Sequence, residues 1–133
     1  MLPVKLTLEG IYSYRERQTI DFTRLTEARL FGIFGSVGSG KSTILEAMIY
    51  AIYGTIDRLN NDVKYNVMNL QSDRLFVDFE FRAGEDERLY RATVECRRNR
   101  KRFADVSSPK YLYHVWEGDG WLPCTREEVV GAI

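Results

Sequence analysis

The sequence is poor in the residues that hold many small domains together. Its 133 residues include two cysteines, Cys96 and Cys124, and a single histidine, His114. The spacing of the cysteines matches no metal-ligand pattern, and the histidine stands alone. We therefore expect neither a structural zinc site nor a disulfide framework.

Net charge and long apolar runs are also lacking. Lysine and arginine together number 19, as do aspartate and glutamate, so no overall charge would draw the protein to nucleic acid or to an anionic membrane. Residues 1–9 alternate polar and apolar side chains, unlike a signal peptide or a membrane span. We predict a soluble, cytoplasmic protein with no membrane partner, in which any nucleic-acid binding needs a local basic patch.

What the sequence does contain is enough apolar material for one compact domain, with 44% hydrophobic and 13% aromatic residues. Period-two alternation predicts strands at residues 4–9, 74–82, 89–97 and 110–116, and residues 17–22 are expected to pair with the first of them. Glycine-containing turns at 84–86 and 118–120 separate the later strands.

Two helices and one further strand complete the predicted elements. A short apolar run at 30–34 predicts a buried strand that leads into residues 41–53, a helix that is apolar almost all round and should be buried. Thr125 and Glu128 have capping-box spacing, and a helix that stops after two turns suggests a truncated chain. This order of elements predicts an α/β fold with an antiparallel flank.

The segment between the predicted strand and helix carries the strongest motif. Gly35, Gly40, Lys41 and Ser42 fit the P-loop pattern G-x-x-x-x-G-K-[ST], and a strand before and a helix after are the context that this pattern needs. Glycines allow backbone N–H groups to approach phosphate oxygens, and the helix N-terminus adds partial positive charge. The alternative is a glycine-rich loop that caps a core helix and binds no ligand.

The P-loop pattern predicts a site for ATP and Mg²⁺. Lys41, the predicted catalytic residue, would place its charge on the β- and γ-phosphates, Ser42 would bind the Mg²⁺ ion, and Thr43 would donate to the α-phosphate. The predicted nucleotide-binding residues of this loop are Gly35, Ser36, Val37, Gly38, Ser39, Gly40, Lys41, Ser42 and Thr43.

The remaining groups that phosphoryl transfer needs are missing from the sequence. Asp78 follows an apolar run, as a Mg²⁺-binding carboxylate would, but the alternation continues past it and predicts an exposed, structural side chain. His114 and Glu117 have no partners that would make them an acid–base pair. We therefore predict one half of a composite site, with the other half on a separate segment.

Residues 31–47 closely resemble the N-terminal segment of SbcC-type repair ATPases, relatives of the chromosome-maintenance ATPases. Residues 6–10, 20–23 and 51–54 and the hairpin 76–91 are similar to the opening of the same family, so that the resemblance covers about the first 100 residues. It implies a P-loop NTPase of the ABC-ATPase type. Residues 1–133 would form the N-terminal half (lobe I) of its head, with a central helix after the P-loop.

The resemblance also implies what lies outside this chain. A long antiparallel coiled coil and a C-terminal half would follow, carrying the signature motif and the Walker B carboxylates. The Mg²⁺-contacting glutamine would come after Ile133, since Gln18 and Gln71 are wrongly placed. Implied partners are that C-terminal half, a second head in an ATP-dependent dimer, an SbcD-type nuclease and double-stranded DNA, in a nucleoid-associated complex. The isolated fragment would be inactive as an ATPase.

Further site residues follow from the resemblance. Met68, Asn69 and Leu70 align with the segment near the nucleotide base. Some members of the family have a nucleotide-contacting arginine in the first loop, where this chain has Tyr12. Arg15 and Arg17 follow it, and the choice among the three residues stays open.

A basic run is the one candidate for a DNA-binding patch. It comprises Arg97, Arg98, Arg100, Lys101 and Arg102, which would neutralise phosphates without reading sequence. The alternative is a solvated hairpin tip, and the nearby Tyr111, Tyr113 and Trp116 are expected to pack. Two other functions share the P-loop: the nucleotide-binding domain of an ABC transporter, and a self-contained small kinase or NTPase.

Overall fold

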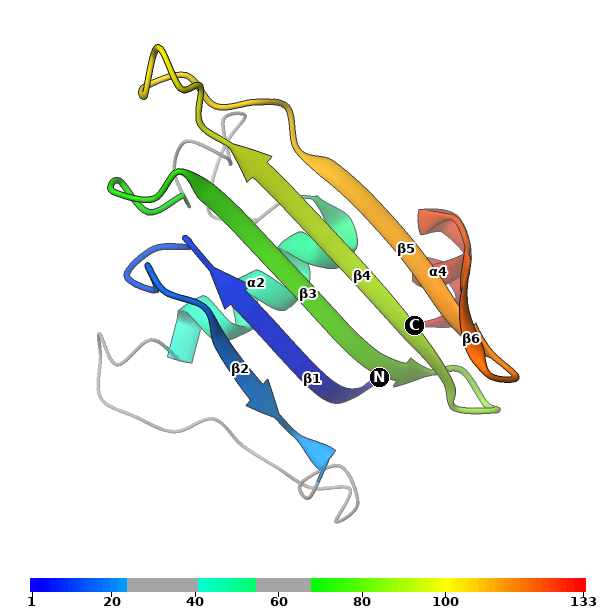
Figure 1. Ribbon diagram of the computed structural model, residues 1–133. Coiled ribbons are helices and arrows are strands. Elements are labelled where there is room, and N and C mark those ends of the chain that lie inside the picture. Colours follow the sequence, from blue (N-terminus) through cyan, green and yellow to red (C-terminus); the bar gives the residue numbers. More distant parts are fainter. Residues whose placement is uncertain (24–40, 55–67) are drawn as a thin grey trace.

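The computed structural model describes residues 1–23, 41–54 and 68–133. These residues form one antiparallel sheet of six strands in the order β2-β1-β3-β4-β5-β6, with two helices on one face (Figure 1). The elements are β1 (Leu2–Glu9), β2 (Gln18–Asp21), α2 (Lys41–Tyr53), β3 (Arg74–Ala83), β4 (Arg88–Arg97), β5 (Lys110–Glu117), β6 (Gly120–Pro123) and α4 (Arg126–Ala132). The α/β class is confirmed, whereas the predicted strand at 30–34 lies outside the described residues.

Strands β1, β3, β4 and β5 are where the alternation predicts them, whereas β6 had not been predicted. On β3, Val77, Phe79 and Phe81 are fully buried, and their cross-strand partners on β4 include Val94 and Ala92, also fully buried. Because every second residue of a strand faces the same side, these side chains form the apolar face on which the helices pack. The expected pairing of residues 17–22 is confirmed by the antiparallel pair of β1 and β2.

Helix α2 begins at Lys41 and ends at Tyr53, as predicted, and Gly54 terminates it with φ +74°. Ala47, Tyr50 and Ala51 are fully buried, and α2 contacts both β3 and β4. The expectation that the whole helix is buried is wrong. The three residues of one stripe, spaced four apart, are 50%, 43% and 41% exposed; they are Leu45, Ile49 and Tyr53.

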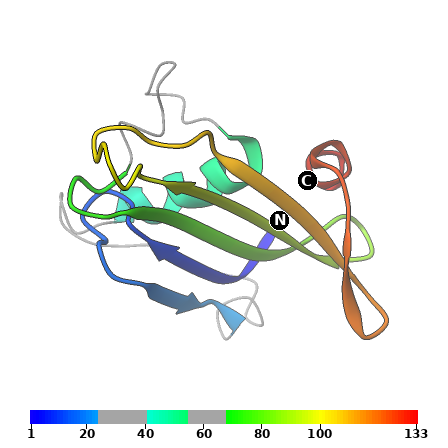
Figure 2. The same ribbon diagram turned by 45° about the horizontal axis from the view of Figure 1, so that its top comes forward.

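The C-terminal end of α2 is held by contacts with β5 and with α4, and α4 lies beside α2 (Figure 2). The hydroxyl of Tyr113 donates to the Ile52 carbonyl at 3.1 Å and accepts from Arg126 Nε at 2.7 Å. The predicted capping box is confirmed, because Thr125 and Glu128 each accept a backbone N–H bond from the other. Among the described residues, neither helix has the length and hydropathy to cross a membrane.

Candidate functional site

The start of α2 is the described part of the P-loop motif. Gly35 to Gly40 lie outside the described residues, and the side chains of Lys41 and Ser42 are likewise not described. Lys41 is the first helical residue, and Thr43 is 9% exposed in the first turn. Both ribbon views place this helix start at the end of the sheet where β1 ends and β3 begins (Figures 1 and 2). A helix N-terminus offers unpaired N–H groups to phosphate, as the motif requires.

The loop between β1 and β2 is held close to β3 at that end of the sheet. Gly10 has φ +67°, and a Cβ there would lie 1.9 Å from the carbonyl oxygen of Arg74, so only glycine fits. Ile11 and Tyr14 then exchange backbone hydrogen bonds at 3.1 and 2.9 Å, with Tyr12 between them at φ +49°. The loop is thus a tight turn with a defined shape.

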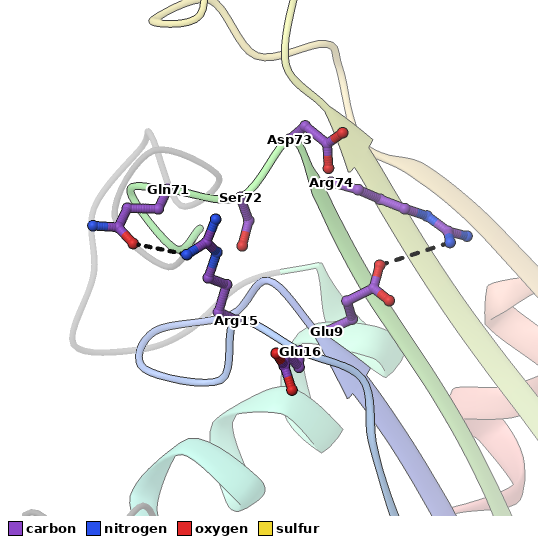
Figure 3. Close-up of a pocket in the computed structure, with 7 residues that line it drawn as sticks. All are labelled: Glu9, Arg15, Glu16, Gln71, Ser72, Asp73 and Arg74. Atoms are coloured by element: carbon purple, nitrogen blue, oxygen red, sulfur yellow. Dashed lines mark hydrogen bonds and ion pairs between the residues drawn. The ribbon is translucent and has the colours of Figure 1, made fainter.

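A cleft of about 470 Å³ opens between this loop and the start of β3 (Figure 3). Its lining residues are Glu9, Arg15, Glu16, Gln71, Ser72, Asp73 and Arg74. Arg15 Nη1 donates to Gln71 Oε1 across the cleft at 3.2 Å. No sequence pattern marks Glu16, Ser72, Asp73 or Arg74 as site residues, because strand alternation does not show which loops meet.

The three residues considered for the family arginine lie in different places. Arg17 is an ion-pair partner of Glu9 at 3.3 Å and lies over the ring of Phe76. Tyr12 packs against the core and accepts a bond from Asn69 Nδ2 on its carbonyl at 2.6 Å. Of the three, Arg15 alone lines the cleft.

The three residues of the segment aligned with the nucleotide base, 68–70, lie in different environments. Met68 is 3% exposed and belongs to the core, whereas Leu70 is 81% exposed. Asn69 is a structural hub, because its backbone N–H donates to Gly10 and its Oδ1 accepts from the Gln71 N–H at 2.9 Å. Leu70 is therefore the residue of this segment with apolar surface to offer a ligand.

The residues of the basic run also differ in their contacts. Arg97 pairs with Glu95 at 2.8 Å, and the guanidinium of Arg98 donates to three backbone carbonyls. The side chains of Arg100, Lys101 and Arg102 are exposed. Arg97 is also exposed, but it is held by Glu95, so these three residues of the loop after β4 are the cations of the run that no ion pair or carbonyl contact engages within the described part of the chain.

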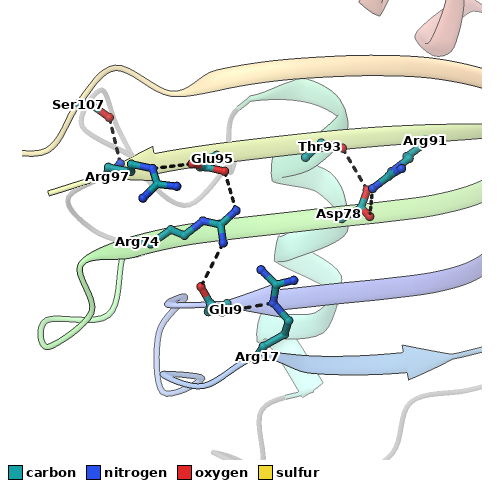
Figure 4. A network of polar contacts seen from close by, with 9 residues as sticks. All are labelled: Glu9, Arg17, Arg74, Asp78, Arg91, Thr93, Glu95, Arg97 and Ser107. Carbon is teal, nitrogen blue, oxygen red and sulfur yellow. Dashed lines mark hydrogen bonds and ion pairs between the residues drawn. The ribbon is translucent and has the colours of Figure 1, made fainter. Parts of the chain in front are cut away.

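Asp78 is on the outer face of the sheet, as expected, but the prediction that it is exposed is wrong. Its side chain is 9% exposed because Arg91 covers it, donating from Nε at 2.7 Å and from Nη2 at 2.8 Å (Figure 4). Thr93 donates a third bond at 3.0 Å. The hydrogen bond to Asp78 raises the pKa of Arg91 above its ordinary value. All these contacts are structural and support the interpretation that Asp78 is no Mg²⁺ ligand.

A second group of polar contacts lies on the outer face next to the cleft (Figure 4). Arg74 lies between Glu9, at 3.8 Å, and Glu95, at 2.7 Å. Burial alone would raise the pKa of Glu95, but hydrogen bonds from Arg74 and Arg97 outweigh it and lower the pKa. Glu117 forms an ion pair with Arg88, so its carboxylate is likewise used in the sheet.

The family model and the similar proteins point to the same family. The sequence model of the AAA domain family matches residues 5–116. The SbcC component of the nuclease SbcCD from Bacillus subtilis is 48% identical over 81 residues, which are 61% of this chain and 7% of that protein. The same component from Treponema pallidum is 31% identical over 127 residues, 91% of this chain and 12% of that protein.

A relative with a different name points the same way. The probable DNA double-strand break repair Rad50 ATPase of Aquifex aeolicus is 36% identical over 100 residues, 71% of this chain and 10% of that protein. The chain thus spans about a tenth of the length of the curated relatives it matches. Because the family match covers most of the chain, the protein belongs to the AAA domain family of P-loop ATPases, and its resemblance to the SbcC-type repair ATPases is confirmed.

Proposed function

We propose that residues 1–133 are the ATP-binding lobe I of an ABC-type head in a DNA double-strand-break repair ATPase. The observation that carries this proposal is the P-loop pattern ending in Lys41-Ser42-Thr43, where α2 begins, within a chain of the AAA domain family. The names of the relatives, a nuclease component and a repair ATPase, support the assignment to repair.

In this proposal the nucleotide lies at the start of α2. By the P-loop motif, residues 35–40 would hold the phosphates, Lys41 would neutralise the β- and γ-phosphates, and Ser42 would hold Mg²⁺. Arg15 and Leu70 approach the rest of the nucleotide from the side of the cleft, because Arg15 lines it and Leu70 is exposed directly before the cleft residue Gln71.

The exposed stripe on α2 supports a head built from two segments. Leu45, Ile49 and Tyr53 lie on one side of the helix and are each more than two-fifths exposed. Apolar side chains in such a row are typical of a helix that packs against another segment. We assign this face of α2 to contact with the C-terminal half. That half would also supply the Walker B carboxylates, since Asp78 is held in an ion pair by Arg91.

The complete head would bind DNA and a partner nuclease as an ATP-dependent dimer. Two nucleotides held between two heads stabilise the closed state by their higher affinity for it, and hydrolysis reverses this preference. Arg100, Lys101 and Arg102 supply exposed positive charge for DNA phosphates, and binding through phosphates weakens with added salt.

The test is Mg²⁺-dependent ATP binding and steady-state hydrolysis by the chain, with Lys41→Ala as the control. Loss of one charge-assisted phosphate contact should weaken ATP binding by roughly 10- to 150-fold. Binding without turnover supports a lobe that needs its second half. Turnover that depends on Lys41 would instead indicate a self-sufficient small NTPase, and affinity unaffected by Lys41→Ala would remove the P-loop assignment.

A second pair of variants tests the cleft. Arg15→Ala should weaken ATP binding, because it removes a cation that lines the cleft. Arg17→Ala is the matched control, since Arg17 is held by Glu9 and Phe76 on the outer face. Equal effects of the two variants on the dissociation constant would exclude a specific role for Arg15.

A further inference from the structure

Arg98 differs from its basic neighbours in having its guanidinium surrounded by carbonyl groups. It donates from Nε to the Ser72 carbonyl at 2.7 Å, from Nη2 to the Asn69 carbonyl at 3.0 Å and from Nη1 to the Phe103 carbonyl at 3.1 Å. It also lies 4.7 Å from the centroid of the Phe103 ring. Arginine presents its donors in a rigid planar fork, so one side chain fixes all three carbonyls relative to one another.

Asn69 holds the other side of the same junction. Its Nδ2 donates to the Tyr12 carbonyl at 2.6 Å and its backbone N–H to the Gly10 carbonyl at 2.8 Å. Its Oδ1 accepts from the Gln71 N–H at 2.9 Å and from the Ser72 hydroxyl at 3.3 Å. Residues 69–72 are therefore bound to the β1–β2 loop on one side and to Arg98 on the other.

The loop that carries Arg98 is itself closed by hydrogen bonds. Asn99 N–H donates to the Asp105 carbonyl at 2.8 Å. Asn99 Oδ1 accepts from the N–H groups of Lys101 and Arg102 at 2.8 and 3.0 Å. These bonds hold the backbone of Lys101 and Arg102 to Asn99 at the base of the loop, next to Arg98.

We propose that Arg98 and Asn69 are positioning residues that couple DNA binding at Arg100, Lys101 and Arg102 to nucleotide binding beside Leu70 and Gln71. This inference rests on the proposed function, because it needs both ligands. In this proposal Arg98 does not contact DNA itself; it connects the basic loop to residues 69–72. DNA that restrains the basic loop restrains residues 69–72 through Arg98, so that the nucleotide then binds a segment that is already ordered.

Thermodynamic linkage makes the effect reciprocal and measurable. If DNA raises the affinity for nucleotide by some factor, nucleotide raises the affinity for DNA by the same factor. Couplings between sites are typically 5- to 150-fold, and we expect about fivefold for a connection through one guanidinium and one amide.

The experiment measures the dissociation constant of a fluorescent, non-hydrolysable ATP analogue with Mg²⁺, with and without a saturating mixed-sequence DNA duplex. It compares the wild-type chain with Arg98→Lys, which keeps the charge but loses the fork, and with Asn69→Asp, which loses the donor to Tyr12. Arg82→Lys is the matched control, because the exposed Arg82 donates to the Glu87 carbonyl at the far end of β3 and belongs to neither proposed binding site. Thermal unfolding of each variant confirms that it is folded.

We compare the dissociation constant of the nucleotide without DNA with that in its presence. Their ratio should be about five in the wild type and in Arg82→Lys, and near one in Arg98→Lys and Asn69→Asp, with both ligands still bound. If only one of these two junction variants folds, its ratio decides. A ratio that stays at the wild-type value in a folded junction variant overturns the inference alone. So does a wild type that binds both ligands without coupling. A wild type that binds no nucleotide overturns the proposed function and the coupling with it.

Discussion

Replacing Asp78 by asparagine tests whether this carboxylate stabilises the sheet or takes part in phosphate chemistry. The side chain accepts two bonds from Arg91, at 2.7 and 2.8 Å, and one from Thr93 at 3.0 Å. Asparagine keeps the shape but turns an N–H₂ group toward one of the guanidinium donors. One charge-assisted bond is thus lost, and the other becomes a bond to a neutral oxygen.

The loss of stability expected for Asp78→Asn depends on how exposed its partner Arg91 is. A hydrogen bond to a charged group contributes about 1.5–3 kcal/mol. The Arg91 side chain is 35% exposed, so water can solvate its charge once the carboxylate is gone, which reduces the loss. We expect Asp78→Asn to lower the free energy of unfolding by about 2 kcal/mol, which moves the urea midpoint down by about 1 M.

Urea denaturation followed by tryptophan fluorescence measures this, since Trp116 and Trp121 pack edge to face on β5 and β6 at 5.3 Å. Asp86→Asn, at the exposed turn of the same hairpin, is the control and should change stability by less than about 0.5 kcal/mol. Replacing both partners, with Asp78→Leu and Arg91→Met, should recover part of the loss because no charge is left unpaired. An unchanged midpoint in Asp78→Asn would refute the stabilising role, and loss of ATP turnover in the assembled ATPase without loss of stability would make Asp78 catalytic.

Two further predictions concern the anchoring of α2 and the outer polar network. Tyr113→Phe should lower the free energy of unfolding by about 2 kcal/mol and Tm by roughly 7 °C, because the Ile52 carbonyl loses its donor and Arg126 its acceptor; an unaltered Tm in calorimetry would contradict this. The lowered pKa of Glu95 means that its stabilising contribution is present above the ordinary pKa of about 4.3 and is lost as pH falls through the folded-state value. Wild type should therefore be more stable than Glu95→Gln at neutral pH, and the two stability curves should converge as the pH falls through the folded-state pKa of Glu95; parallel curves would exclude the linkage.

Local patterns in the sequence were sufficient for most elements of the fold. Strands β3 and β4 follow from the alternation of residues such as Val77, Phe79 and Val94, because burial of one face of a sheet needs a period of two. Helix α2 follows from its apolar, proline-free composition and from Gly54. The capping box at Thr125 and Glu128 is a local interaction, and it formed as its spacing predicts.

The sequence-based predictions were wrong where residues far apart in the sequence contact one another. Asp78 is buried because Arg91, on the neighbouring strand, covers it, and alternation reports a face of the sheet but not what lies on that face. Leu45, Ile49 and Tyr53 are exposed although their helix is apolar, because a helix against a single sheet can bury only one side. Arg98 was grouped with its basic neighbours, since sequence adjacency does not reveal that its guanidinium reaches the carbonyls of residues 69 and 72.

The sequence by itself determined the class of the protein and its predicted chemistry, because a P-loop is a contiguous motif whose strand, glycines, lysine and helix follow one another in the chain. The order of elements along the chain was equally local in origin. Only the tertiary structure decided which first-loop residue lines the cleft, which cations of the basic run are engaged by other groups, and which carboxylates are used in ion pairs. Each of these depends on side chains far apart in sequence that the antiparallel sheet brings into hydrogen-bond distance, a relation that no local pattern encodes.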